Sequence, residues 1–144
     1  MKIITFLILF SFTSLLGNTP YLDQADTVTI FLNQKKIGEW TEFSKPVHLK
    51  VKSGLSDTLK IFASTDWGGL DKATIKILDV NGQLIKTLAK TPHSRYDTHR
   101  GEYITDLKSI FKAKDNKIQI VISNMQGYKK IIPNRHIFNL TIEK

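Results

Sequence analysis

Apolar side chains recur at every second position through much of this chain, in short runs that turn-forming residues separate. This period of two is typical of a β-strand, in which successive side chains point to opposite faces, and it differs from the 3.6-residue period of a helix. Clear examples are residues 28–32, 47–52, 58–64, 118–122 and 138–142. The pattern predicts an all-β protein, an antiparallel sandwich of about seven or eight strands.

Two segments depart from this alternation. After Thr105-Asp106, the apolar residues Leu107, Ile110 and Phe111 have the spacing of a helix face, which predicts one short helical turn. The stretch from Thr91 to Glu102 has no apolar period and contains proline, serine, histidine and arginine, so we expect an exposed loop.

The strongest local signal is Asn81-Gly82 between two β-type runs, because such a turn needs residues that tolerate positive φ. The surrounding sequence, Asp79-Val80-Asn81-Gly82-Gln83-Leu84-Ile85-Lys86-Thr87-Leu88, resembles a hairpin of bacterial secreted Ig-like modules, as in flagellar hook-capping domains and the C-terminal sorting domains of type IX secretion. Gly101-Glu102-Tyr103 is similar to their later G-x-Y. The resemblance covers about a dozen residues and implies an Ig-like antiparallel β-sandwich.

Residues 1–17 combine Lys2 with a long apolar run and small residues, which is typical of a secretory signal peptide. Leu15-Leu16-Gly17 would suit a lipoprotein leader, but Asn18 stands where the acylated cysteine would be, so no lipid anchor is expected. The apolar run is short for a transmembrane helix, and none of about 20 residues follows. We therefore expect a flexible arm at 18–25, a β-sandwich at 26–144, and a periplasmic or secreted location.

Charge and cysteine content narrow the possible partners. The chain has no cysteine, which excludes disulfides, thiolate nucleophiles and cysteine-ligated metals. Its formal net charge of +8 favours anionic partners such as an acidic polysaccharide, lipid headgroups or another cell-envelope component, and a protein partner is an alternative. Nucleic acid is not expected after export, and no known nucleic-acid-binding motif occurs. Alternatively, lysines such as Lys50 and Lys52 only solvate strands and guard sheet edges.

The segment from His93 to Arg100 holds two of the four histidines and both arginines of this region. Arg95, His99 and Arg100 could donate hydrogen bonds to an anionic or sugar ligand, with Tyr96 as a stacking surface. The arginines would repel a cation, so we expect neither a metal nor another cofactor here. The alternative is a polar connection in which Arg95 and Asp97 satisfy each other.

Asp66-Trp67-Gly68-Gly69 is a second candidate for ligand contact. Trp67 beside two glycines offers an open ring for stacking on a sugar, and Asp66 could accept hydroxyl hydrogen bonds. The alternative is that Trp67 closes one end of the core. Trp40 lies in the first hairpin, where packing explains it.

Catalytic motifs are missing from the sequence, which contains no G-x-S-x-G, H-E-x-x-H or phosphate-binding glycine loop. We therefore expect a non-enzymatic binding or interaction module, with a ligand site formed by Asp66, Trp67, Arg95, Tyr96, His99 and Arg100. Two alternatives stay open. One is a structural subunit that assembles through its sheet edges, and the other is a small hydrolase whose carboxylates meet only in the folded state.

Overall fold

The computed structural model describes residues 26–54, 56–66, 68–111, 116–127 and 130–143. The expected signal peptide and arm lie outside these residues, as does Trp67. The described chain forms nine strands: β1 Thr27–Leu32, β2 Lys35–Thr41, β3 Val47–Lys52, β4 Thr58–Ser64, β5 Thr74–Leu78, β6 Leu84–Leu88, β7 Arg100–Asp106, β8 Lys117–Gly127 and β9 Lys130–Glu143.

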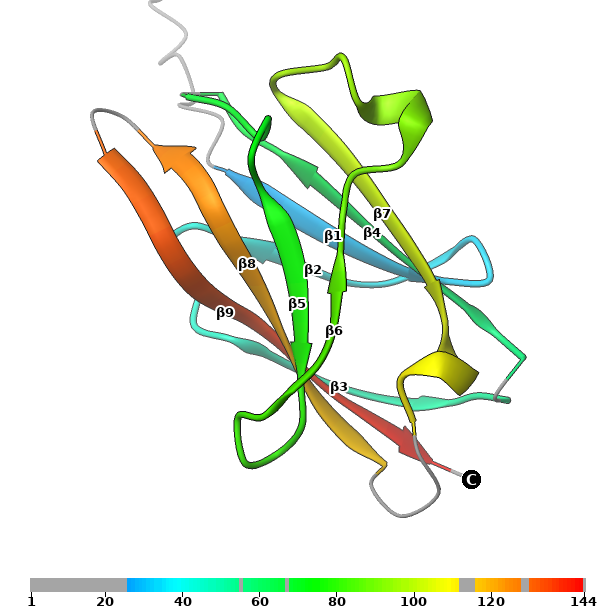
Figure 1. The fold of residues 1–144 in the computed structure, drawn as a ribbon. Helices are drawn as coiled ribbons and strands as arrows, with labels where there is room; N and C mark the ends of the chain where they lie inside the picture. Colours follow the sequence, from blue (N-terminus) through cyan, green and yellow to red (C-terminus); the bar gives the residue numbers. More distant parts are fainter. Residues whose placement is uncertain (1–25, 55, 67, 112–115, 128–129, 144) are drawn as a thin grey trace, which may run out of the picture.

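The strands form two sheets that lie in two layers (Figure 1), with the orders β2-β1-β4-β7 and β3-β9-β8-β5-β6. The all-β sandwich expected from the alternation is therefore present. Two details differ from the prediction. The described chain has nine strands instead of seven or eight, and β3 pairs with β9 in parallel while the other named pairs are antiparallel. Parallel pairing joins segments distant in sequence, so alternation within one strand carries no sign of it.

The core fills the space between the sheets with the apolar half of each alternating strand. In β1 and β4 the inward residues are almost fully buried, and their neighbours in sequence are only half-buried. Trp40 belongs to this core, as its position in the first hairpin suggested. The largest fully buried side chains include Trp40, Tyr103, Phe138, Ile61 and Ile120.

Helical structure in the described residues is limited to two 3₁₀ turns, η1 Pro92–Ser94 and η2 Leu107–Ser109. The turn expected after Thr105-Asp106 is η2, in which the Asp106 side chain accepts a hydrogen bond from the Ser109 N–H at 2.7 Å. The turn η1 lies in the segment expected to be irregular, and β7 begins within that segment at Arg100. The described part of the chain contains no helix with the length and hydrophobicity needed to span a bilayer.

The two hairpin turns differ from what the sequence predicts, which is a tight first turn at Gln34-Lys35 and a second turn at Asn81-Gly82. Both residues of the tight β1–β2 turn, Asn33 and Gln34, have positive φ, at 46° and 68°. In the β5–β6 hairpin only Gly82 does, at 79°, and the Gly82 N–H bonds to the Asp79 carbonyl at 3.1 Å. The Asp79 carboxylate also accepts from the N–H groups of Asn81 and Gln83, both at 2.8 Å. The hairpin was predicted correctly, but its turn is longer than Asn81-Gly82 alone.

Replacing Gly82 with valine is expected to lower the free energy of unfolding by about 1–2 kcal/mol, because a β-branched residue resists positive φ. A Cβ atom at Gly82 would meet nothing within 4 Å, so the effect would be conformational and not steric. Gly82→Asn is the control, since asparagine tolerates the left-handed region and should cost less. Thermal unfolding of the two variants measures the difference, and equal melting temperatures would contradict this assignment.

Glycine at position 101 allows Tyr103 to pack across its own strand. A Cβ atom on Gly101 would lie 3.0 Å from the Tyr103 ring, which is fully buried. The Tyr103 hydroxyl donates a hydrogen bond to the Ala73 carbonyl at 3.1 Å, so the ring links β7 to the segment that leads into β5. Burial raises the pKa of the Tyr103 phenol well above its ordinary value. The G-x-Y pattern therefore has a local structural role.

Arg135 on β9 connects the two sheets near the end of β2. Its guanidinium lies over the Trp40 ring, 4.8 Å from the ring centroid, and donates a hydrogen bond to the Glu42 carbonyl. The Trp40 indole N–H donates to the Ser44 carbonyl at 3.2 Å. These contacts hold the end of β2 against β9.

Candidate functional site

The segments predicted to bind ligand are brought together at one end of the sandwich. The Thr65 N–H bonds to the His99 carbonyl at 2.9 Å, and the Leu70 N–H bonds to the Thr98 carbonyl at 2.7 Å. Asp66 therefore lies on a segment beside the one that carries His99 and Arg100. This end is opposite the β5–β6 hairpin (Figure 1).

The predicted side chains themselves are open to solvent. Arg95, Tyr96, His99 and Arg100 are all exposed, with Tyr96 at 89%. The Asp97 carboxylate accepts hydrogen bonds from the backbone N–H groups of His99 at 2.9 Å and Arg100 at 3.0 Å. It thus stabilises the loop through the backbone, and not through Arg95 as in the alternative given above. A ligand site at this end stays a prediction.

The structure also tests whether distant acidic residues meet. Asp26 and Glu42 are neighbours, since the Glu42 N–H bonds to the Asp26 carbonyl at 3.0 Å. Burial and the nearby Asp26 raise the pKa of the Glu42 carboxyl, and Arg135 opposes that shift. Within the described residues, no group of three or more histidine, aspartate or glutamate side chains is arranged to hold a metal ion.

A different surface brings polar side chains from several strands together, and we call it the cationic face. It is the outer face of the five-stranded sheet, and the strand register defines its rows. One row crosses β3, β9, β8 and β5 as His48, Asn139, Gln119 and Leu78, and the next crosses β3, β9 and β8 as Lys50, Thr141 and Lys117. Adjacent strands lie about 4.8 Å apart, so each row brings side chains from distant segments within reach of one small ligand.

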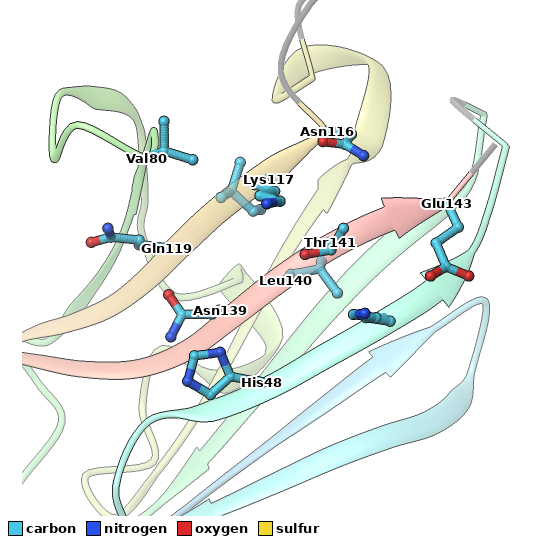
Figure 2. A pocket seen from close by; sticks show the side chains of 11 residues that line it. His48, Val80, Asn116, Lys117, Gln119, Asn139, Leu140, Thr141 and Glu143 are labelled. Carbon is cyan, nitrogen blue, oxygen red and sulfur yellow. The ribbon is translucent and has the colours of Figure 1, made fainter.

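These rows border a groove of about 480 Å³. Figure 2 shows His48, Asn139 and Thr141 on one side of it, with Gln119 and Lys117 on β8 and Val80 on the hairpin beyond. Amide and hydroxyl groups can donate or accept hydrogen bonds, and the lysines add positive charge. The groove therefore suits a ligand that carries an anionic group and several hydrogen-bonding atoms.

The charges on this face are unbalanced. The described outward positions include Lys50, Lys52, Lys76 and Lys117, whereas the acidic residue at the groove is Glu143. The outer face of the four-stranded sheet differs, because there Lys36 pairs with Glu39 at 2.5 Å and Lys60 pairs with Glu102 at 3.7 Å. Lys50 and Lys117 belong to neither pair. Glu143 offsets only part of this charge, so an incoming anion would meet a net positive charge at the groove.

Alternation along single strands puts His48, Lys50 and Lys52 on one face of β3, and it puts Lys117 and Gln119 on the outward face of β8. Asn139 and Thr141 likewise alternate with apolar residues of β9, but alternation within a strand does not bring these sets onto one surface. The missing information was the pairing of β3 with β9, which places these sets side by side.

The hairpin resemblance noted in the sequence stays local, because it extends over only a small part of the fold. Comparisons with protein-family models, with curated proteins and with solved structures found no match for this chain.

Proposed function

We propose that this protein is an exported, non-enzymatic binding module that holds an anionic ligand on its cationic face. The observation that carries the proposal is the groove of about 480 Å³, which Lys50, Lys117 and His48 line together with the amides of Gln119 and Asn139. The proposed periplasmic or secreted location rests on the leader-like residues 1–17. Charge-assisted hydrogen bonds from the lysines would supply affinity, and the amides would supply orientation.

We also propose that the sandwich is Ig-like. The order β9-β8-β5-β6 corresponds to strands G, F, C and C′ of a variable-type Ig domain, and the pairing of β4 with β7 corresponds to B with E. The hairpin resemblance around Asn81-Gly82 supports the same assignment. The inter-sheet disulfide of antibody domains has no counterpart, since the chain contains no cysteine.

The sheet edges support a binding role over assembly by strand pairing. Edge strand β3 presents Lys50 and Lys52 to solvent. Edge strand β6 has five residues, and Lys86 on it bonds across to hydroxyls of the other layer. At edge strand β7, the Glu102 N–H bonds to the Ser94 hydroxyl at 3.0 Å, so a loop covers part of that edge. Lysines, short strands and covering loops are the usual protections against edge pairing.

The proposal is tested by titrating the domain with two polysaccharides, anionic polygalacturonate and neutral dextran. Changes in the backbone amide NMR shifts report binding. We expect salt-sensitive binding of polygalacturonate, with shifts on β3, β8 and β9. Replacing both Lys50 and Lys117 with glutamine should weaken binding at least tenfold, because each charged hydrogen bond contributes about 1.5–3 kcal/mol.

The matched control replaces Lys35 and Lys72, two exposed lysines away from the groove, and removes the same charge. Equal losses in the two double variants would reduce the effect to diffuse attraction. A larger loss for Arg100→Ala than for the groove variant would place the ligand at the loops around Asp66 and His99 instead.

A further inference from the structure

The cationic face changes character from one edge of the sheet to the other. Following the row of His48, Asn139 and Gln119 onward, β5 contributes Leu78, which pairs with Leu84 on β6. Leu84 is 58% exposed, and Val80 on the hairpin above is 47% exposed. One continuous row therefore begins with an imidazole and two amide side chains and ends with the apolar side chains of Leu78, which is half-buried, and Leu84, which is exposed.

A second, smaller hollow adjoins the groove on this apolar side. It has a volume of about 240 Å³ and is lined in part by Leu84, Ile85 and Ile110. Lys117 and Ile118 line both hollows, so the two meet at the start of β8. Lys117 thus lies at the boundary between the groove and a hollow that Asp79 and Gln83 line together with the apolar side chains.

We propose that the ligand of the cationic face is a single-headed amphiphilic anion, with its carboxylate or phosphate between Lys50 and Lys117 and its unbranched apolar chain over Val80 and Leu84. This inference rests on the proposed function and specifies its ligand. Charge complementarity places the anionic head group at Lys50 and Lys117, because neither lysine takes part in the described ion pairs. An extended hydrophilic polyanion would leave Val80 and Leu84 exposed beside it, whereas an apolar chain removes them from water.

The dimensions agree with this orientation. Lys117 is on β8 and Leu84 is on β6, two strands away in the same sheet, which corresponds to about 10 Å. An alkyl chain attached to a head at Lys117 would cross this distance without leaving the sheet surface.

The experiment is calorimetric titration with three probes: dodecyl phosphate below its aggregation concentration, ethyl phosphate, and dodecyl maltoside. We expect dodecyl phosphate to bind at least tenfold more tightly than ethyl phosphate, because each methylene removed from water strengthens binding by up to about fourfold. Dodecyl maltoside, which has the chain but no charge, should bind at least tenfold more weakly than dodecyl phosphate.

Two double variants separate the contributions. Val80→Ser with Leu84→Ser should abolish most of the advantage of the long chain, measured as the ratio of the affinity for dodecyl phosphate to the affinity for ethyl phosphate. The matched control, Phe43→Ser with Ile131→Ser, removes two exposed apolar side chains elsewhere and should keep that advantage. Amide NMR spectra of each variant verify the fold, and shifts near Leu78 should appear with dodecyl phosphate but not with ethyl phosphate.

Each outcome is decisive. If both phosphates bind equally and need Lys50 and Lys117, the proposed function stands and the amphiphile is overturned. If dodecyl maltoside binds as tightly as dodecyl phosphate, the single-headed anion is likewise overturned. If no anion binds through Lys50 and Lys117, both proposals fail.

Discussion

Gly101→Ala is expected to lower the free energy of unfolding by about 2 kcal/mol, a large loss for the addition of one methyl group. The new Cβ atom would lie 3.0 Å from both Cε2 and Oη of Tyr103. That ring is fully buried and its hydroxyl is bonded to the Ala73 carbonyl, so it cannot move aside without losing packing or a hydrogen bond. Thermal unfolding followed by circular dichroism should show a melting temperature lower by roughly 5–10 °C.

Gly54→Ala is the matched control, because a Cβ atom there would lie 3.8 Å from the Ser56 hydroxyl oxygen, an ordinary contact. It should change stability by less than about 0.5 kcal/mol. In a Tyr103→Leu background, the further cost of Gly101→Ala should shrink, since the ring it displaces is gone. Equal stability of the Gly101 and Gly54 variants would show that Tyr103 does not require the glycine.

Arg135→Ala is expected to destabilise the domain by about 2–3 kcal/mol at neutral pH. The variant loses a charged hydrogen bond to the Glu42 carbonyl, worth roughly 1.5–3 kcal/mol, and a cation–π contact with Trp40, worth about 0.5–1 kcal/mol. Arg135→Lys keeps the charge but loses the planar group, so its melting temperature should fall between those of the wild type and Arg135→Ala.

The Arg135→Ala effect should also depend on pH. The pKa of Glu42 is raised by burial and by Asp26 and is lowered by Arg135, so the ionised carboxylate opposes folding and Arg135 offsets that cost. Without Arg135, the cost grows wherever Glu42 is ionised in the unfolded chain and disappears once it is protonated in both states. The stability difference between wild type and Arg135→Ala should therefore shrink as the pH falls through the titration range of Glu42. A stability difference that does not change with pH would show that Arg135 does not stabilise the ionised Glu42 carboxylate.

The sequence predicted what depends on neighbours along the chain. The strands β3 and β4 were located to the residue because their alternation is uninterrupted. The β5–β6 hairpin was found because glycine tolerates positive φ, whereas the turn at Asn33 and Gln34 was placed one residue late because glutamine gives no such signal.

The candidate site could be predicted only in pieces. Outward residues such as Lys50 and Lys117 were recognised from alternation, but strand pairing between distant segments decides whether they share a surface. The predicted aromatic and arginine cluster relied on residue types that often bind ligands. The structure gathers polar groups around a groove elsewhere, on a face built from amides, hydroxyls and lysines. Composition of a single loop could not reveal that arrangement.

The parallel pairing of β3 with β9 has a consequence for the order of folding. Val47 lies opposite Phe138, so β3 has no partner in its sheet until nearly the last described residues are available. Contacts between such distant segments form slowly, because the entropy cost of closing a long loop comes before the stabilising strand contacts form. His48 and Lys50 meet Asn139 and Thr141 only at this step. The groove therefore exists only once the sheet is complete. A chain synthesised from its amino terminus would form the proposed binding surface last.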